Sequence, residues 1–117
     1  MDDDNIRLEV FFYRSEHGSE PVRVWLKSLP FDEKRIIGED IKTVQFGWPL
    51  GMPMVRKLEP GLWEVRSKLA DKIARVIFTV KDQKMVLLHG FIKKSDKTPQ
   101  DDLKVAHQRL AQVRGEK

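Results

Sequence analysis

The sequence contains no cysteine. This absence excludes a disulfide framework, a thiolate metal site and a cysteine nucleophile, and it is typical of proteins in a reducing compartment. The sequence also lacks any apolar run approaching the roughly 20 residues that a membrane helix needs. Residues Met1–Asp4 are acidic where a signal peptide would be basic. We therefore expect a cytoplasmic protein that is neither secreted nor embedded in a membrane.

The chain is short and mildly basic. Its 117 residues carry 22 Lys and Arg against 18 Asp and Glu, a formal charge of +4. A chain of this length buries about two thirds of its unfolded surface, so we expect one domain over residues 1–117, and two separate cores are excluded. The positive excess lies in residues 61–99, which contain nine basic and four acidic residues. Such a segment is either a phosphate-binding surface or a solvated sheet face.

Hydrophobic spacing and turn residues divide the first half of the chain into short elements. Residues Ile6–Tyr13 predict a strand, which a turn follows. A helix is expected from a cap at Ser19 to a stop at Pro30. A second helix is expected from a cap at Asp32 to a stop at Gly47, and the two helices should form a hairpin.

The second half of the chain predicts a small sheet. Residues 47–60 carry several glycine and proline turn signals and predict a loop with a brief strand. Three strands follow in antiparallel order, at Leu62–Lys68, Ile73–Val80 and Lys84–Ile92, and Pro99 opens a last helix. The order β-α-α-β-β-β-α predicts an α+β fold with a small antiparallel sheet of about four to five strands flanked by helices, because no βαβ alternation demands a parallel one.

Strand alternation assigns the charged residues to faces of this sheet. In the middle strand, Val76 and Phe78 point to the side of the helices, so Arg75 points away from that core. Arg66 of the preceding strand is expected on the same open face as Arg75. Both faces of the third strand are apolar, so the side on which His89 lies stays undetermined.

An open face with Arg66 and Arg75, bordered by lysines and Phe91, suits single-stranded RNA. Guanidinium groups clamp phosphates, and an aromatic ring can stack a base. Equally, the two arginines would pair with Glu64 and Asp71 across the meander, each pair worth about 0.2–1 kcal/mol at a surface. The residues alone leave both interpretations open.

Other chemistry finds little support in the residues. His89 is either a general acid or base or a structural residue. The tryptophans Trp25, Trp48 and Trp63 are expected in packing rather than in base stacking. No pair of histidines or carboxylates has helical metal-ligand spacing, and there is no P-loop or GxSxG motif. Metal and serine-nucleophile chemistry are therefore disfavoured.

Two strings at a fixed separation give a more specific signal. They are GLWEVR at residues 61–66 and LLHGFIKK at residues 87–94, and GSEPVRVWL precedes them at residues 18–26. Together with the segment from Arg56 to Pro99, they resemble the RelE/HigB superfamily of bacterial toxins, in particular its phage-related HigB-like branch. The resemblance covers about residues 6–112.

The resemblance implies a compact antiparallel sheet flanked by helices, and an endoribonuclease that cuts mRNA in the ribosomal decoding site. Such toxins need no metal or other cofactor. The implied reaction is attack of an RNA 2′-hydroxyl on its own adjacent phosphate. The implied partners are mRNA on the ribosome and a cognate antitoxin, expected to be a HigA-like helix-turn-helix protein. The rival hypothesis is a non-catalytic, phage-derived regulator that binds RNA or protein on the same fold.

The resemblance also implies roles for individual residues. Arg66 and Arg75 match the sheet-face arginines that stabilise the phosphate and the transition state. Lys93 and Lys94 match a basic exit, where one binds the RNA backbone or acts as general acid. Some members carry a tyrosine near the last helix, but Tyr13 is the only tyrosine here. Either His89 or His107 is then expected as base, with His89 preferred, or the substrate and the ribosome supply most of the alignment. The RNA-binding residues are expected to be Arg56, Lys57, Phe91 and Lys97.

Overall fold

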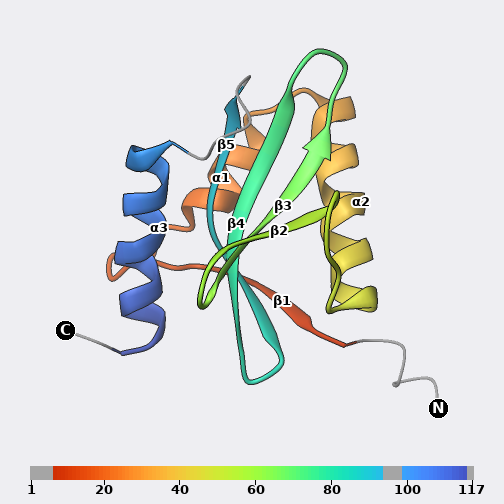
Figure 1. Ribbon diagram of the computed structural model, residues 1–117. Helices are drawn as coiled ribbons and strands as arrows, with labels where there is room; N and C mark the ends of the chain where they lie inside the picture. The colour runs from red at the N-terminus through yellow and green to blue at the C-terminus, as the bar shows by residue number, and fades with distance from the viewer. Residues whose placement is uncertain (1–6, 94–98, 116–117) are drawn as a thin grey trace.

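The computed structural model describes residues 7–93 and 99–115, with the side chain of Lys93 left out. The described residues form three helices and five strands (Figure 1). In chain order they are β1 (Glu9–Phe12), α1 (Pro21–Lys27), α2 (Phe31–Gly47), β2 (Val55–Glu59), β3 (Leu62–Lys68), β4 (Ile73–Lys81), β5 (Lys84–Lys93) and α3 (Gln100–Val113). The predicted α+β fold class is confirmed, and β2 is the brief strand expected within residues 47–60.

The five strands form one sheet in the order β1-β5-β4-β3-β2. Strands β2 to β5 make the predicted antiparallel meander. Strand β1 runs parallel to β5, so the sheet is mixed and the expectation of a wholly antiparallel sheet is wrong. The reason is that β1 pairs with a strand some seventy-five residues away, between Glu9 and Lys84, and no local pattern encodes that choice of edge.

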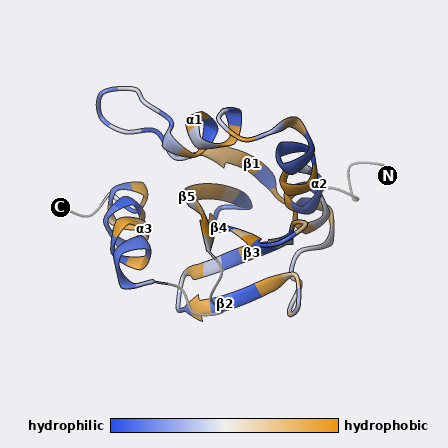
Figure 2. Cartoon of the chain, turned by 90° about the horizontal axis from the view of Figure 1, so that it is seen from above, coloured by the Kyte–Doolittle hydropathy of each residue, from blue (hydrophilic) through white to orange (hydrophobic). Residues whose placement is uncertain are grey.

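The sheet is covered on both faces (Figure 2). On one face, α1 lies against β5 and β1, and α2 lies against β3. Their buried residues pack with alternate residues of the strands, such as Val76 and Phe78. On the other face, α3 packs Ala106 and Leu110 against Ile77 of β4. The expectation of a single core is therefore corrected: the buried hydrophobic residues form two clusters, one on each face, because the amphipathic α3 covers the face that was expected to be open.

The helix boundaries differ from prediction at their N-termini. The cap residue of α1 is Glu20, while Ser19 lies in the preceding turn with its Oγ 2.9 Å from Oγ of Ser15. Helix α2 begins at Phe31 directly after Pro30, so Asp32 lies inside its first turn, where a carboxylate still favours the helix dipole. The two helices pack mainly on the sheet rather than as a hairpin. In the described part of the chain, no helix combines the length and the apolar character needed to cross a bilayer.

An irregularity in the β4–β5 pair decides where His89 lies. The hairpin turns at Asp82 and Gln83, whose positive φ angles of 52° and 63° are those of a tight two-residue turn. Along the ladder, Phe78 pairs with Leu87 but Ile77 pairs with His89, so Leu88 is an extra residue in β5. Such a bulge interrupts the alternation of side chains. Leu88 and His89 both contact elements on the α3 side, which the sequence pattern left undetermined.

The tryptophans pack as expected. Trp48 and Trp63 meet edge to face with ring centroids 5.1 Å apart, and Trp63 stacks on Phe78 at 5.9 Å. Trp25 of α1 covers Gly90 of β5 so closely that a Cβ atom at Gly90 would lie 2.3 Å from Cε3 of Trp25. The glycine in LLHGF therefore lets a helix approach the strand.

We expect Gly90→Ala to destabilise the protein by about 1–3 kcal/mol, because the added methyl group overpacks the contact with Trp25. Gly38→Ala is the matched control, since Gly38 lies within α2 and a Cβ there meets no atom within 4 Å. That control should gain about 0.5–1 kcal/mol from helix propensity. Urea unfolding of the three proteins measures both values, and equal midpoints for Gly90→Ala and wild type would contradict the packing argument.

Candidate nucleic-acid interface

The α3 face of the sheet holds a cluster of three arginines around one carboxylate. Arg66 of β3 pairs in register with Arg75 of β4, and Arg56 of β2 pairs with Glu64 of β3. Because residues two apart in a strand share a face, all four side chains lie on one side. We call Arg56, Glu64, Arg66 and Arg75 the arginine cluster. The predicted sharing of a face by Arg66 and Arg75 is confirmed.

Glu64 lies at the centre of the arginine cluster. Its Oε2 is 3.6 Å from Nη1 of Arg66, 3.6 Å from Nη1 of Arg75 and 4.0 Å from Nη1 of Arg56. Glu64 and Arg75 are both 0% exposed, whereas the side chain of Arg66 is 15% exposed and that of Arg56 is 36% exposed. Among the described residues, three guanidinium groups surround this one carboxylate, and Arg56 and Arg66 reach solvent.

The burial of Arg75 corrects one expectation about the site. Arg75 points away from the α1 and α2 core as predicted, but that side of the sheet is not open, and no part of the Arg75 side chain reaches solvent. Arg66 and Arg75 do pair with Glu64, as the alternative interpretation expected. The pairs lie in the interior rather than on the surface. Direct access to a phosphate is therefore available to Arg66 and Arg56.

His89 lies one row along the sheet from Arg75. Its neighbour Phe91 is the register partner of Arg75, and His89 and Phe91 stack with ring centroids 5.6 Å apart. Nε2 of His89 lies 2.6 Å from Oδ1 of Asp102 in the first turn of α3. Phe91 is only 8% exposed, so its ring supports the imidazole rather than offering a free platform to a base. Sequence reasoning missed Asp102, which reads as an ordinary acid at a helix N-terminus.

A second group of contacts, also missed from the sequence, holds α3 to the sheet. Nη1 of Arg109 donates to the carbonyl oxygen of Leu88 at 2.8 Å, and its guanidinium lies 5.3 Å from the centre of the Tyr13 ring. The Tyr13 hydroxyl donates to Oε1 of Gln112. Burial lowers the pKa of Arg109 below its usual value, although nearby Tyr13 acts in the opposite direction. The only tyrosine therefore joins β1 to α3.

Several predicted RNA-binding residues are not brought to the arginine cluster. Lys57 is exposed, and its Nζ lies 6.0 Å from the Trp63 ring, which packs on the α1 and α2 side of the sheet. His107, the other histidine considered as base, lies 2.9 Å from Oε2 of Glu59. Lys93 ends β5, while Lys94 and Lys97 lie outside the described residues, so the roles of these lysines stay predictions. In residues 7–93 and 99–115, no three acidic or histidine side chains gather as metal ligands.

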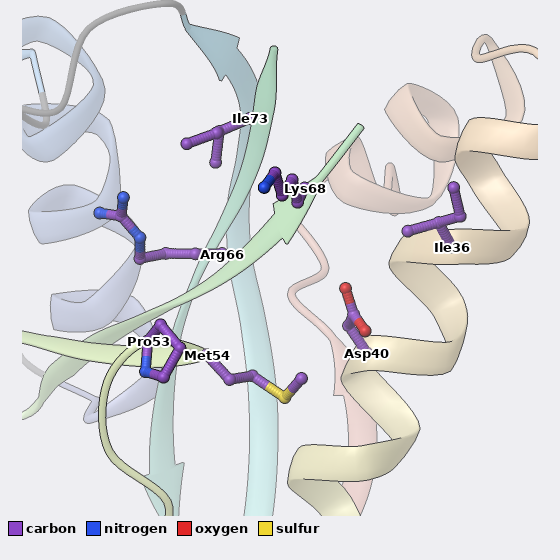
Figure 3. A pocket seen from close by; sticks show the side chains of 7 residues that line it. All are labelled: Ile36, Asp40, Pro53, Met54, Arg66, Lys68 and Ile73. Carbon is purple, nitrogen blue, oxygen red and sulfur yellow. The ribbon is translucent and has the colours of Figure 1, made fainter. Parts of the chain in front are cut away.

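A pocket of about 410 Å³ adjoins the arginine cluster (Figure 3). We call it the edge pocket, because it lies between α2 and the edge of β3. Ile36 and Asp40 of α2 line one side, and Arg66 and Lys68 of β3 line the other. Arg66 therefore belongs both to the arginine cluster and to the wall of this pocket.

Comparison with known proteins gives one family. The sequence profile described as phage derived protein Gp49-like matches residues 24–111, which is about three quarters of the chain. The match includes the whole meander, the arginine cluster, His89 and Asp102. No curated protein matches the sequence significantly.

We expect Glu64→Gln to destabilise the protein by about 3–5 kcal/mol, since it leaves the buried Arg75 without its carboxylate. Glu39→Gln is the control, because Glu39 pairs with Arg35 on the exposed side of α2 and should change stability by no more than about 1 kcal/mol. Both values come from urea unfolding followed by tryptophan fluorescence. A loss below about 1 kcal/mol for Glu64→Gln would show that the buried charges do not depend on one another.

Proposed function

Because the chain belongs to the Gp49-like family of phage-derived proteins, a RelE/HigB-type toxin family, we propose that it is the toxin of a toxin–antitoxin system. We further assign it the activity of a HigB-like mRNA interferase, an endoribonuclease that cuts mRNA on the ribosome and so inhibits translation. The observation that carries this assignment is the arginine cluster, in which the guanidinium-bearing side chains of Arg66 and Arg56 reach solvent.

The proposed reaction is attack of an RNA 2′-hydroxyl on its own adjacent phosphate, without a metal. The 2′-oxygen forms a bond to phosphorus, and the bond from phosphorus to the 5′-oxygen of the next nucleotide breaks. The reaction needs a base for the hydroxyl, positive charge beside the phosphate and a proton for the leaving oxygen. It also needs the attacking and leaving oxygens in line. The decoding site of the ribosome supplies that alignment in this proposal, which is why free mRNA should be a poor substrate.

Within this reaction, the burial of each residue suggests its role. Arg66 and Arg56, which reach solvent, contact the phosphate and the charge that develops on it. Glu64 and Arg75, which do not, act as positioning residues that fix the two exposed guanidinium groups. Lys93 or Lys94 binds the RNA backbone or protonates the leaving oxygen, and Lys57 and Lys97 contact mRNA or ribosomal RNA.

His89 is the proposed general base. A neutral imidazole that donates from Nε2 to Asp102 leaves Nδ1 as the acceptor of the hydroxyl proton. Asp102 is then a positioning residue, because a carboxylate on one ring nitrogen fixes the tautomer and the orientation of the ring. Stacking on Phe91 restrains the ring further.

The family also implies an antitoxin partner. We propose a HigA-like helix-turn-helix antitoxin, whose acidic side chains cover the exposed arginines or which caps another surface so that the complex no longer fits the ribosome. A substrate on the ribosome places the toxin in the cytoplasm.

The second candidate function is a regulator that binds RNA or protein without cutting. The complete burial of Glu64 and Arg75 favours it, since that is the arrangement of a structural ion pair.

Purified protein should cut a defined mRNA when ribosomes are present, and Arg66→Ala should lower the cleavage rate by about 10²–10³-fold because it removes a donor to the transition state. Primer extension with and without ribosomes measures the cuts. Arg35→Ala is the matched control, because Arg35 is exposed on α2 and pairs only with Glu39 among the described residues. Absence of cuts by folded wild-type protein under both conditions would favour the non-catalytic regulator.

His89→Gln should lower the single-turnover cleavage rate on the ribosome by about 10²–10⁴-fold, the usual contribution of a general base. Asp102→Asn should lower it less, because the ring keeps its nitrogen but loses the carboxylate that orients it. His107→Gln should cleave like wild type, since His107 pairs with Glu59 instead. Full activity of a folded His89→Gln variant would remove His89 from the mechanism.

A further inference from the structure

The edge pocket exists because β2 stops pairing with β3 before β3 ends. The last register pair is Val55 with Val65, and the amide of Arg66 donates to the carbonyl oxygen of Met54 at 2.8 Å. Pro53, the residue before Met54, has no amide hydrogen with which to continue the ladder. In the described part of the chain, the last residues of β3 therefore have no strand neighbour on this edge, and the pocket opens there.

The walls of the edge pocket are mostly apolar. Aliphatic or thioether surface comes from Ile36 of α2, from Met54 just before β2, and from Ile73 of β4 (Figure 3). The volume of about 410 Å³ lies within the range of roughly 300–1,000 Å³ for small-ligand pockets. Apolar side chains can hold the flat faces of an unstacked base, as they do in enzymes that take up single nucleotides of a strand. The pocket therefore has the size and the surface for one nucleobase.

Two polar groups on the wall keep their hydrogen-bonding capacity unused. Asp40 is half-buried and Lys68 is exposed. Within residues 7–93 and 99–115, neither side chain forms an ion pair or a hydrogen bond. Nearby charged residues do pair, as Lys72 does with Glu33 at 3.1 Å. An ionised carboxylate only accepts hydrogen bonds, so Asp40 selects for a ligand edge that donates.

Arg66 connects this pocket to the phosphate site. Arg66 lines the pocket, and its guanidinium belongs to the arginine cluster, on the side of β3 away from Ile36 and Asp40 (Figure 3). An RNA strand whose phosphate lies at Arg66 therefore passes beside the edge pocket.

We propose that the edge pocket binds one nucleobase of the RNA, and that Asp40 selects a base carrying an exocyclic amino group over uracil. The inference deepens the proposed function and rests on it. With the 4-position of the base turned towards Asp40, cytosine offers its N4 amino group to the carboxylate, whereas uracil presents a carbonyl oxygen with like partial charge. Cytosine and uracil are nearly equal in size, so the pocket discriminates between them by hydrogen bonding alone.

Binding is tested without any cleavage. Cytidine 5′-monophosphate and uridine 5′-monophosphate are titrated separately into the full chain with methyl groups labelled for NMR. Cytidine monophosphate should shift the methyl signals of Ile36, Met54 and Ile73 at concentrations where uridine monophosphate does not, and Asp40→Asn should abolish the difference. Equal shifts with both nucleotides, or no shift at these methyl groups, overturn the proposal.

Selectivity is then tested on the ribosome by sequencing the 5′ ends of cut mRNA. Wild-type protein should cut about tenfold more often where cytosine rather than uracil occupies one position beside the cut. Asp40→Asn should lose this ratio, and Asp32→Asn, an exposed substitution on the same helix, should keep both the ratio and the total cleavage.

The outcomes separate the two claims. Cleavage with the same base ratio in wild type and Asp40→Asn overturns the role of Asp40 and leaves the proposed function standing. Absence of cleavage by wild type contradicts the proposed function, and with it the claim that the bound base belongs to a cleaved RNA.

Discussion

Burial of the Glu64 carboxylate among three guanidinium groups is the constraint on which the α3 face of the sheet depends. Removing a carboxylate or a guanidinium from water costs several kcal/mol per ion, and only close opposite charges offset that cost. Glu64 and Arg75 lie on neighbouring strands with no exposure and Nη1–Oε2 at 3.6 Å, so each makes the burial of the other tolerable. Arg66 and Arg56 complete the ring of charge at its solvent side, and their positions are set by the same carboxylate.

Helix α3 packs on the same face of the sheet as the arginine cluster and covers part of that face. Its contacts with the sheet come from both ends of the chain: Asp102 with His89, Arg109 with the Leu88 carbonyl, and Tyr13 with Gln112. These contacts hold α3 against the sheet, while Arg75 is fully buried and Arg66 lies next to the edge pocket. The candidate site is therefore a border between a packed interior and solvent, where positive charge is held in place and is still accessible to a phosphate.

Much of the fold was predictable because its signals are local. The turn at Asp82 and Gln83 and the period of two in β3 and β4 gave the meander, and the same period placed Arg66 and Arg75 on one face. The failures concern contacts that a local pattern does not encode. The single-core expectation left α3 without a face to cover, so Arg75 was expected at the surface. Arg56 and Lys57 were both expected to bind RNA, although adjacent residues of a strand point to opposite faces.

The sequence by itself determined the strands and helices, the composition of each sheet face and, through the matched profile over residues 24–111, the family. These properties depend on residues that are neighbours along the chain. Only the tertiary structure decided that β1 pairs with β5 in parallel, that the extra Leu88 turns His89 towards Asp102, and that Glu64 and Arg75 are buried together. The physical reason is that burial and partner choice depend on which distant elements pack over a residue, and the residue's own neighbours carry no record of that packing.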